Sequence, residues 1–240
     1  MIMKKLMFIA AMAAFILMDV TASAQFVQST GRFGGSSSSS AAPEALFSTV
    51  DFTYSPVTMA ASSGDDSDSL EMTGISINWS QARNISNQYP VYLQYGAGLQ
   101  YTWHTESDSD DDYYSFSSTT SFLTIKVPVN IAYNLMVPNT KVSIMPYVGL
   151  NANIHLLGQN NYTYEYSGSE SSGSSDYFSE DDMGKNAYNR FVIGWQIGAM
   201  VSYQKFFVGI GYAGPVTNLY SDDKYKIYHE QTNLSVGIKF

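Results

Sequence analysis

The last eleven residues of this 240-residue chain, Glu230 to Phe240, alternate strictly between two kinds of side chain. Alternate positions are occupied by Thr, Leu, Val, Ile and Phe, and the positions between them by Gln, Asn, Ser, Gly and Lys. A period of two predicts a β-strand and excludes an α-helix. The length matches the roughly 9–11 residues with which a tilted strand crosses a bilayer. The segment therefore predicts a membrane-crossing strand, with a strand of a soluble sandwich as the alternative.

The first 24 residues have the features of an export signal. Lys4 and Lys5 supply the positive start, residues 6–18 form an apolar run, and small residues lead to a predicted cleavage between Ala24 and Gln25. The run of 13 apolar residues is too short for a transmembrane helix, and an uncleaved anchor is the alternative. We therefore expect domains at 1–24 (signal peptide), 25–43 (flexible Gly/Ser-rich linker) and 44–240 (β-barrel).

Composition excludes several classes of function. The chain has no Cys, so disulfides, a lipoprotein anchor, a thiolate zinc site and a Cys nucleophile are all excluded. Without the signal, 10 basic and 20 acidic residues remain. A chain this acidic is a poor nucleic-acid binder, and we expect neither a nucleic-acid partner nor a cofactor.

Eight segments show the alternation seen at the end of the chain. They are Ala45–Met59, Leu70–Ala82, Val91–His104, Phe116–Asn134, Lys141–Leu156, Ala187–Tyr203, Phe206–Ala213 and Glu230–Phe240. The face opposite the apolar one carries Gly, Ser, Asn, Gln and single charges, which suits the interior of a small membrane barrel. The sequence therefore predicts an all-β fold, an eight-stranded antiparallel up-and-down transmembrane β-barrel. Pro128 and Pro146 cannot donate to a strand ladder, so we expect bulges or bends there.

The connections alternate between short and long. Short links follow the second, fourth and sixth segments, and longer ones follow the first, third, fifth and seventh. This pattern predicts short periplasmic turns, long extracellular loops, and both termini in the periplasm. The long loops hold sixteen of the twenty acidic residues and are rich in Ser and Gly, which predicts solvated, mobile segments. Their acidic runs include Asp65, Asp66, Asp68, Asp108, Asp110, Asp111, Asp112, Asp181 and Asp182.

Five stretches carry a family resemblance: Val91–Trp103, Ile125–Tyr133, Ile144–Leu150, Phe191–Gly198 and Leu234–Phe240. With them the chain resembles the small outer-membrane β-barrel proteins of Bacteroidetes, which are porin-like and akin to OmpA/OmpX-type and PorT-like barrels. The resemblance implies a place in the cell outer membrane, contact with its lipid and lipopolysaccharide, insertion by the barrel assembly machinery, and a monomer. It implies no catalytic motif.

Three histidines, His104, His155 and His229, fall where strands meet the long connections. Strand parity points all three inward. They are candidates for a metal site or for acid–base chemistry with loop carboxylates, and the alternative is a set of polar residues at a wet rim.

Single charges also lie on the inward face. They are Asp51, Lys126, Arg190 and Lys239, and we expect a static network in which Asp51 pairs with Lys239 across the closing seam. An ion path is the alternative. The acidic runs could bind Ca²⁺ or other divalent cations, or a surface ligand, or could be solvated repulsive loops, since EF-hand spacing is absent.

These patterns favour a non-enzymatic outer-membrane barrel with a structural or surface-interaction role through its acidic loops. Three alternatives remain open: a narrow porin-like channel for small solutes, an enzyme with a site at the rim, and a PorT-like accessory role in secretion.

Overall fold

A computed structural model of the chain describes residues 45–63, 66–86, 88–110, 114–166, 169–184, 187–221 and 225–240. The predicted signal peptide and linker lie outside these residues. Among the residues described, no helix has the length and apolarity that a bilayer crossing demands.

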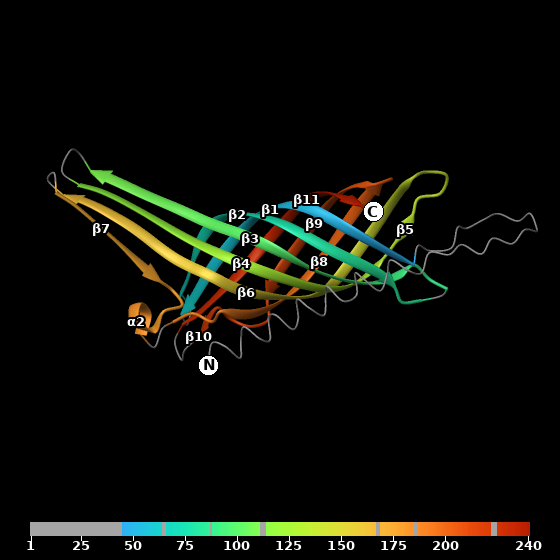
Figure 1. Cartoon of the computed structure of the whole chain (residues 1–240). Coiled ribbons are helices and arrows are strands. Elements are labelled where there is room, and N and C mark those ends of the chain that lie inside the picture. The colour runs from blue at the N-terminus through green and yellow to red at the C-terminus, as the bar shows by residue number, and fades with distance from the viewer. Residues whose placement is uncertain are drawn as a thin grey trace, which may run out of the picture. The chain divides into compact units, whose positions relative to one another are not determined.

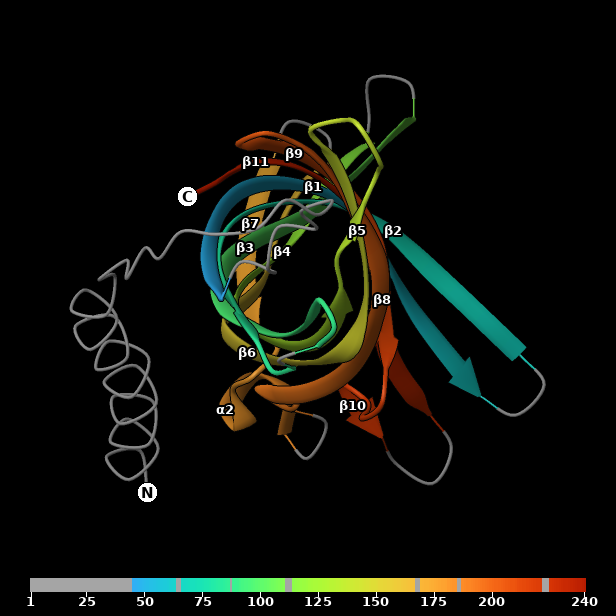
Figure 2. The ribbon, with the colours of Figure 1, turned by 90° about the vertical axis from the view of Figure 1, so that its right-hand side faces the viewer.

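Eight antiparallel strands form a closed ring (Figure 2). They are β1 (Leu46–Ser63), β2 (Asp66–Asn84), β3 (Val91–Asp110), β4 (Tyr114–Tyr133), β6 (Val142–Tyr166), β8 (Phe191–Tyr203), β9 (Phe206–Pro215) and β11 (Lys226–Lys239). Each ring strand pairs with the next ring strand along the chain, and β1 pairs with β11 to close the ring. The predicted eight-stranded up-and-down barrel is confirmed.

Four shorter elements lie outside the ring path. β5 (Leu135–Met136) and β7 (Ser169–Asp176) both pair with β6, and β10 (Tyr220–Ser221) pairs with β11. α2 (Glu180–Met183) is a single turn, capped by the Ser179 side chain, which accepts a hydrogen bond from the Asp181 N–H. None of these four elements was predicted from the sequence.

The two faces of the ring strands have the predicted polarity. Apolar side chains such as Ile77 and Val236 point outward and are exposed, at 65% and 57% of their surface. Polar side chains such as Thr53, Gln100 and Asn151 point inward and are buried. A soluble barrel has the opposite arrangement, because removing apolar surface from water stabilises the folded state. A lipid-facing surface requires apolar side chains outside.

The last residue of the chain completes the ring. Ser48 and Phe240 exchange both backbone hydrogen bonds, with N···O distances of 2.8 and 2.9 Å. Further along the seam, Phe52 pairs with Val236, and Tyr54 pairs with Leu234. The ring therefore has no free strand edge here, which is the condition for a sheet in a bilayer.

Several predicted loops are strand instead. β1 and β2 reach Ser63 and Asp66, while β3, β4, β6 and β7 run far beyond the ring (Figure 1). The expected mobile loops at 105–115 and 157–186 are therefore largely a four-stranded sheet, which we name the hairpin extension. It comprises residues 104–110, 114–121, 158–166 and 169–176. Its Ser, Thr and Tyr residues pair across strands, which composition alone did not reveal.

The two prolines behave differently from the prediction. Pro128 pairs with Asn151 with no register shift, so no bulge lies there; instead the β3–β4 ladder is interrupted on the other side of the residue. Pro146 lies where pairing between β4 and β6 stops, before β5 resumes it in the same register. The shift in register lies at Leu156, where β6 has an extra residue.

The outward face of β11 allows a first prediction. Val236→Arg should reduce folded barrel more than Ile238→Arg, because an outward charge costs roughly 2–4 kcal/mol at the bilayer midplane and about 0–1 kcal/mol near an interface. The measurement is the heat-modifiable folded band recovered from membranes. Val236→Thr, which keeps the side-chain shape, is the control. Normal assembly of Val236→Arg would reverse the assigned faces of this strand.

Candidate functional site: the barrel interior and its loop end

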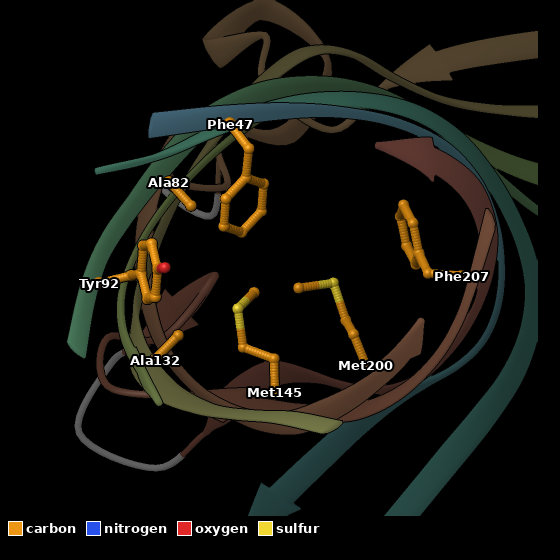
Figure 3. Close-up of a cluster of buried hydrophobic side chains, with 7 residues drawn as sticks. All are labelled: Phe47, Ala82, Tyr92, Ala132, Met145, Met200 and Phe207. Atoms are coloured by element: carbon orange, nitrogen blue, oxygen red, sulfur yellow. The ribbon is translucent and has the colours of Figure 1, made fainter. Parts of the chain in front are cut away.

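Apolar side chains fill the interior at the end of the barrel that carries the short turns. They come from inward positions near the turn end of seven strands. Figure 3 shows them converging on the lumen: Phe47, Ala82, Tyr92, Ala132, Met145, Met200 and Phe207. The Phe47 and Tyr92 rings meet edge to face at 5.3 Å between centroids. We name this set the turn-end cluster.

Tyr147 packs against the turn-end cluster from the side of the barrel centre. Its hydroxyl lies against the backbone of Gly198 and Gly211, where a Cβ atom on either residue would overlap it. The inward glycines therefore make room for the Tyr147 side chain, which reaches from β6 over β8 to β9. Such room is needed because an eight-stranded barrel has an interior only just wide enough for side chains to fill.

A chain of side-chain hydrogen bonds lines the middle of the interior. Neighbouring donors and acceptors lie 2.6–3.3 Å apart. The chain passes through Thr49, Ser80, Gln94, Asn130, Gln196, Asn151 and Asn153, on six different strands. Buried amides satisfied in this way stabilise the interior, whereas unpaired ones would destabilise it.

A second set of hydrogen bonds crosses the lumen. Gln100 on β3 donates to Gln231 on β11 at 3.2 Å, although β1 and β2 separate these strands in the ring. Gln231 in turn donates to Asn233, which also accepts from Ser55 at 2.8 Å. The side chains in the middle of the barrel therefore contact each other from opposite walls.

The predicted charge network is only partly assembled. Asp51 accepts hydrogen bonds from Thr53 and Asn78, both at 2.7 Å, and the cation whose charge acts on it is Lys126. Lys126 is buried. Lys239, the partner expected from the sequence, instead places its Nζ 4.0 Å from the centroid of the Phe47 ring. The strand register explains this, because Asp51 lies opposite Gly237 while Lys239 lies opposite Thr49.

Arg190 does not point into the lumen as parity predicted. It precedes β8, and its side chain is half exposed. It lies 3.9 Å from Asp176, donates to the backbone carbonyl of Leu156 at 2.9 Å, and covers the Phe178 ring. Strand alternation does not extend to residues outside the strand, and for this reason the assignment was wrong.

A second apolar group closes the end of the interior that carries the long connections. It contains Phe122 and Leu219, each 1% exposed, together with Val57, Met72, Phe178 and Val192. Phe178 and Leu219 come from connections that fold back over the mouth of the ring. We name this set the loop-end cluster.

Three tyrosines extend the loop-end cluster outward. Tyr177 stacks on Phe122 and on Tyr188, with centroids 5.6 and 5.0 Å apart. Burial, followed by the nearby Tyr177 and Tyr220, raises the pKa of Tyr188 to about 12. Its hydroxyl therefore stays protonated at physiological pH.

Two of the three histidines belong to this end of the lumen. His155 shares a hydrogen bond of 2.8 Å with Thr124 and lies 5.9 Å from His229, ring centroid to ring centroid. His104 is separate, with its Nδ1 2.6 Å from the carbonyl oxygen of Glu71. In the described part of the chain, no three His, Asp or Glu residues group as metal ligands. The three-histidine rim site is therefore not assembled.

A cavity of about 40 Å³ lies beneath the loop-end cluster. Its lining includes Gln100, Asn151, His155, His229 and Gln231. Such a volume holds one to a few waters and no larger solute.

Those acidic-run residues that the structure describes lie on strands and on α2 rather than on long loops. Asp68 and Asp108 are exposed on β2 and β3, and the backbones of Asp66 and Asp110 belong to the same strands. Asp181 and Asp182 lie in α2, where Asp182 accepts a hydrogen bond from the Asp176 N–H at 2.7 Å. Asp65, Asp111 and Asp112 lie outside the described residues.

Sequence reasoning missed the two apolar clusters. The available signal was the presence of large apolar residues at inward parity, such as Phe47, Tyr92, Phe122 and Phe207, at the ends of strands whose centres are polar inside. The contribution of Phe178 and Leu219 had no such signal, because both lie between strands.

Residues 47–221 match the family model described as outer membrane protein beta-barrel domain, and the chain belongs to this family. Its location is therefore the outer membrane. No curated protein matches the sequence.

The chain is also similar, at low identity, to solved structures of outer-membrane proteins. Ail, the attachment invasion locus protein of Yersinia pestis, is 12% identical, with 81% of this chain and 98% of Ail covered and a TM-score of 0.32. Neisserial surface protein A is 17% identical, with 82% and 98% covered and a TM-score of 0.36. The N-terminal β-barrel domain of Pseudomonas aeruginosa OprF is 15% identical, with 80% and 97% covered and a TM-score of 0.27.

The buried charges provide the second prediction. Lys126→Met should lower the free energy of unfolding in detergent by roughly 2 kcal/mol, because it leaves Asp51 without its cation. The expected loss is smaller than the roughly 3–5 kcal/mol that breaking a direct buried ion pair costs, because Asp51 keeps its hydrogen bonds from two neutral donors. Adding Asp51→Asn should restore most of the loss in a urea titration. Lys205→Met, at an exposed turn, is the control; an equal loss there would contradict the coupling.

Proposed function

We propose that this protein is a non-enzymatic, non-conducting outer-membrane barrel whose role is to hold the hairpin extension at the cell surface for contact with a partner. One observation carries the proposal: the interior is filled at three levels, by the turn-end cluster, the hydrogen-bonded middle and the loop-end cluster. A barrel with no path for solutes through its lumen can act only through its outer surfaces.

The orientation belongs to the same proposal. The hairpin extension is rich in Ser, Thr and carboxylates, which suits water and not lipid. It continues from the end of the barrel opposite the short turns. We infer that this end is extracellular and that both termini are periplasmic.

The surroundings follow from the outward face. Its apolar side chains suit outer-membrane lipid and the acyl chains of lipopolysaccharide, and the ring leaves no strand edge that would require a second copy. We therefore infer a monomer, inserted by the barrel assembly machinery as the Bacteroidetes resemblance implies.

The filled lumen weighs against the alternative of a solute channel. Phe122 is buried in the loop-end cluster and Tyr147 packs against the turn-end cluster, so both occupy interior space that a solute would need. The alternative of an enzyme with a site at the rim is weakened, because the three histidines do not come together in one site. A PorT-like role in secretion rests on resemblance alone.

The purified protein should show no conductance steps in a planar bilayer. Phe122→Ala should also remain silent, because the turn-end cluster and the hydrogen-bonded middle still close the lumen. A general porin reconstituted in the same bilayers is the positive control. Reproducible steps from the wild-type protein would overturn the closed-barrel proposal.

Single cysteines can establish the orientation, since the chain has none of its own. A membrane-impermeant maleimide should label Ser172→Cys on β7 in intact cells and should label Lys141→Cys, near a short turn, only after lysis. Labelling is read as a mass shift on gels, with both variants labelled in lysed cells as the control. Labelling of Lys141→Cys alone in intact cells would invert the orientation.

A further inference from the structure

The two faces of the hairpin extension differ in chemistry. On one face Phe116, Tyr162 and Tyr164 form an aromatic group: the Phe116 and Tyr164 centroids are 4.8 Å apart, and those of Tyr162 and Tyr164 are 5.4 Å apart. On the opposite face, Ser117, Thr163 and Ser172 lie side by side. Directly opposed residues in a sheet share a face, so the strand register places the aromatic residues on one face and the hydroxyl residues on the other.

The aromatic face is available to a partner. Tyr164 is 41% exposed and Tyr166, further out on the same face, is 69% exposed. Towards the barrel, the face continues into Gly158, which Phe122 and Phe178 cover. The extension therefore carries an aromatic strip that is buried at the ring and open beyond it.

Carboxylates border the aromatic strip. Asp108 on β3 lies directly opposite Phe116, which lies opposite Tyr164, so the three side chains form one row across the sheet. Glu106 begins the next row, opposite Ser118, which pairs with Tyr162. Both carboxylates are exposed.

Among the residues that the structure describes, no Lys or Arg forms an ion pair with these carboxylates. The sequence has no Lys or Arg between Arg83 and Lys126, or between Lys141 and Lys185, so the hairpin extension contains none. Among the described residues, neither Glu106 nor Asp108 forms an ion pair; the pair that is present joins Arg190 to Asp176. The negative charge beside the aromatic strip is therefore available to an outside cation.

We propose that the aromatic face of the hairpin extension binds an extended polypeptide segment that presents arginine or lysine at every second residue. A cationic side chain would lie over the Phe116–Tyr164 pair while it bonds to Asp108. A second cation two residues along would reach Glu106, because alternate residues of a strand lie on one side with the same spacing as Asp108 and Glu106. The proposal rests on the surface role proposed above and names its partner class.

Charge distinguishes this occupant from others. A second copy of the chain would bring the same carboxylates to the face, and the chain as a whole has a net charge of −9. An anionic polymer would be repelled for the same reason. A neutral glycan could stack on the aromatic rings but would gain little from Asp108.

The test uses the full-length protein in detergent and a fluorescent peptide of about eight residues in which Arg and Ser alternate. Binding is measured by anisotropy at low and physiological salt. Asp108→Asn should weaken binding about fivefold, the worth of roughly 1 kcal/mol, and Tyr164→Ser by a similar factor. Glu165→Gln removes a charge of the same sign from the opposite face and should change binding less than twofold.

Heat-modifiable mobility confirms that each variant is folded. Equal weakening by Asp108→Asn and Glu165→Gln would overturn the proposal, because it would mean attraction to net charge alone. Equal binding of a peptide with Glu in place of Arg, or no binding by a folded protein, would also overturn it. Binding of cellohexaose that Tyr164→Ser abolishes and Asp108→Asn leaves unchanged would replace the peptide with a neutral glycan. None of these outcomes bears on conductance, so the closed-barrel proposal stands or falls separately.

Discussion

Closure of the backbone hydrogen-bond ring is the constraint on which the rest of this structure depends. In hydrocarbon an unpaired N–H or C=O costs several kcal/mol, so a sheet is stable there only when its first and last strands pair. The exchange between Ser48 and Phe240 meets this condition with the last residue of the chain. The remaining strands need only alternate in polarity and follow one another around the ring.

Closure at eight strands leaves an interior that side chains must fill. The protein fills it in layers. Aromatic and Met side chains close the turn end, amides and hydroxyls bond across the middle, and Phe122, Phe178 and Leu219 close the loop end. The charges fit this scheme, since Asp51 has two neutral donors as well as the charge of Lys126. An interior packed in this way shifts function to the strands that leave the bilayer.

Residues 104–121 and 158–176 illustrate the limit of pattern reasoning. Their Ser, Gly and acidic composition is typical of mobile loops, yet the described residues in these ranges continue the strands of the barrel. The ring holds the roots of β3, β4 and β6 side by side in a fixed register, and this lowers the entropic cost of extending the hairpins. Long-range pairing therefore outweighed the weak local propensity of these residues.

The sequence by itself determined the number of ring strands, their approximate centres, which face of each meets lipid, and the polar character of the middle of the lumen. Each of these depends on alternation along one strand, which is a local property. The tertiary structure decided which side chains come near each other. The charge of Lys126 acts on Asp51, Arg190 pairs with Asp176, His155 lies beside His229, and Asp108 shares a row with Phe116 and Tyr164. These arrangements depend on register and on the return of connections over the barrel mouth, which residues far apart in the chain decide together.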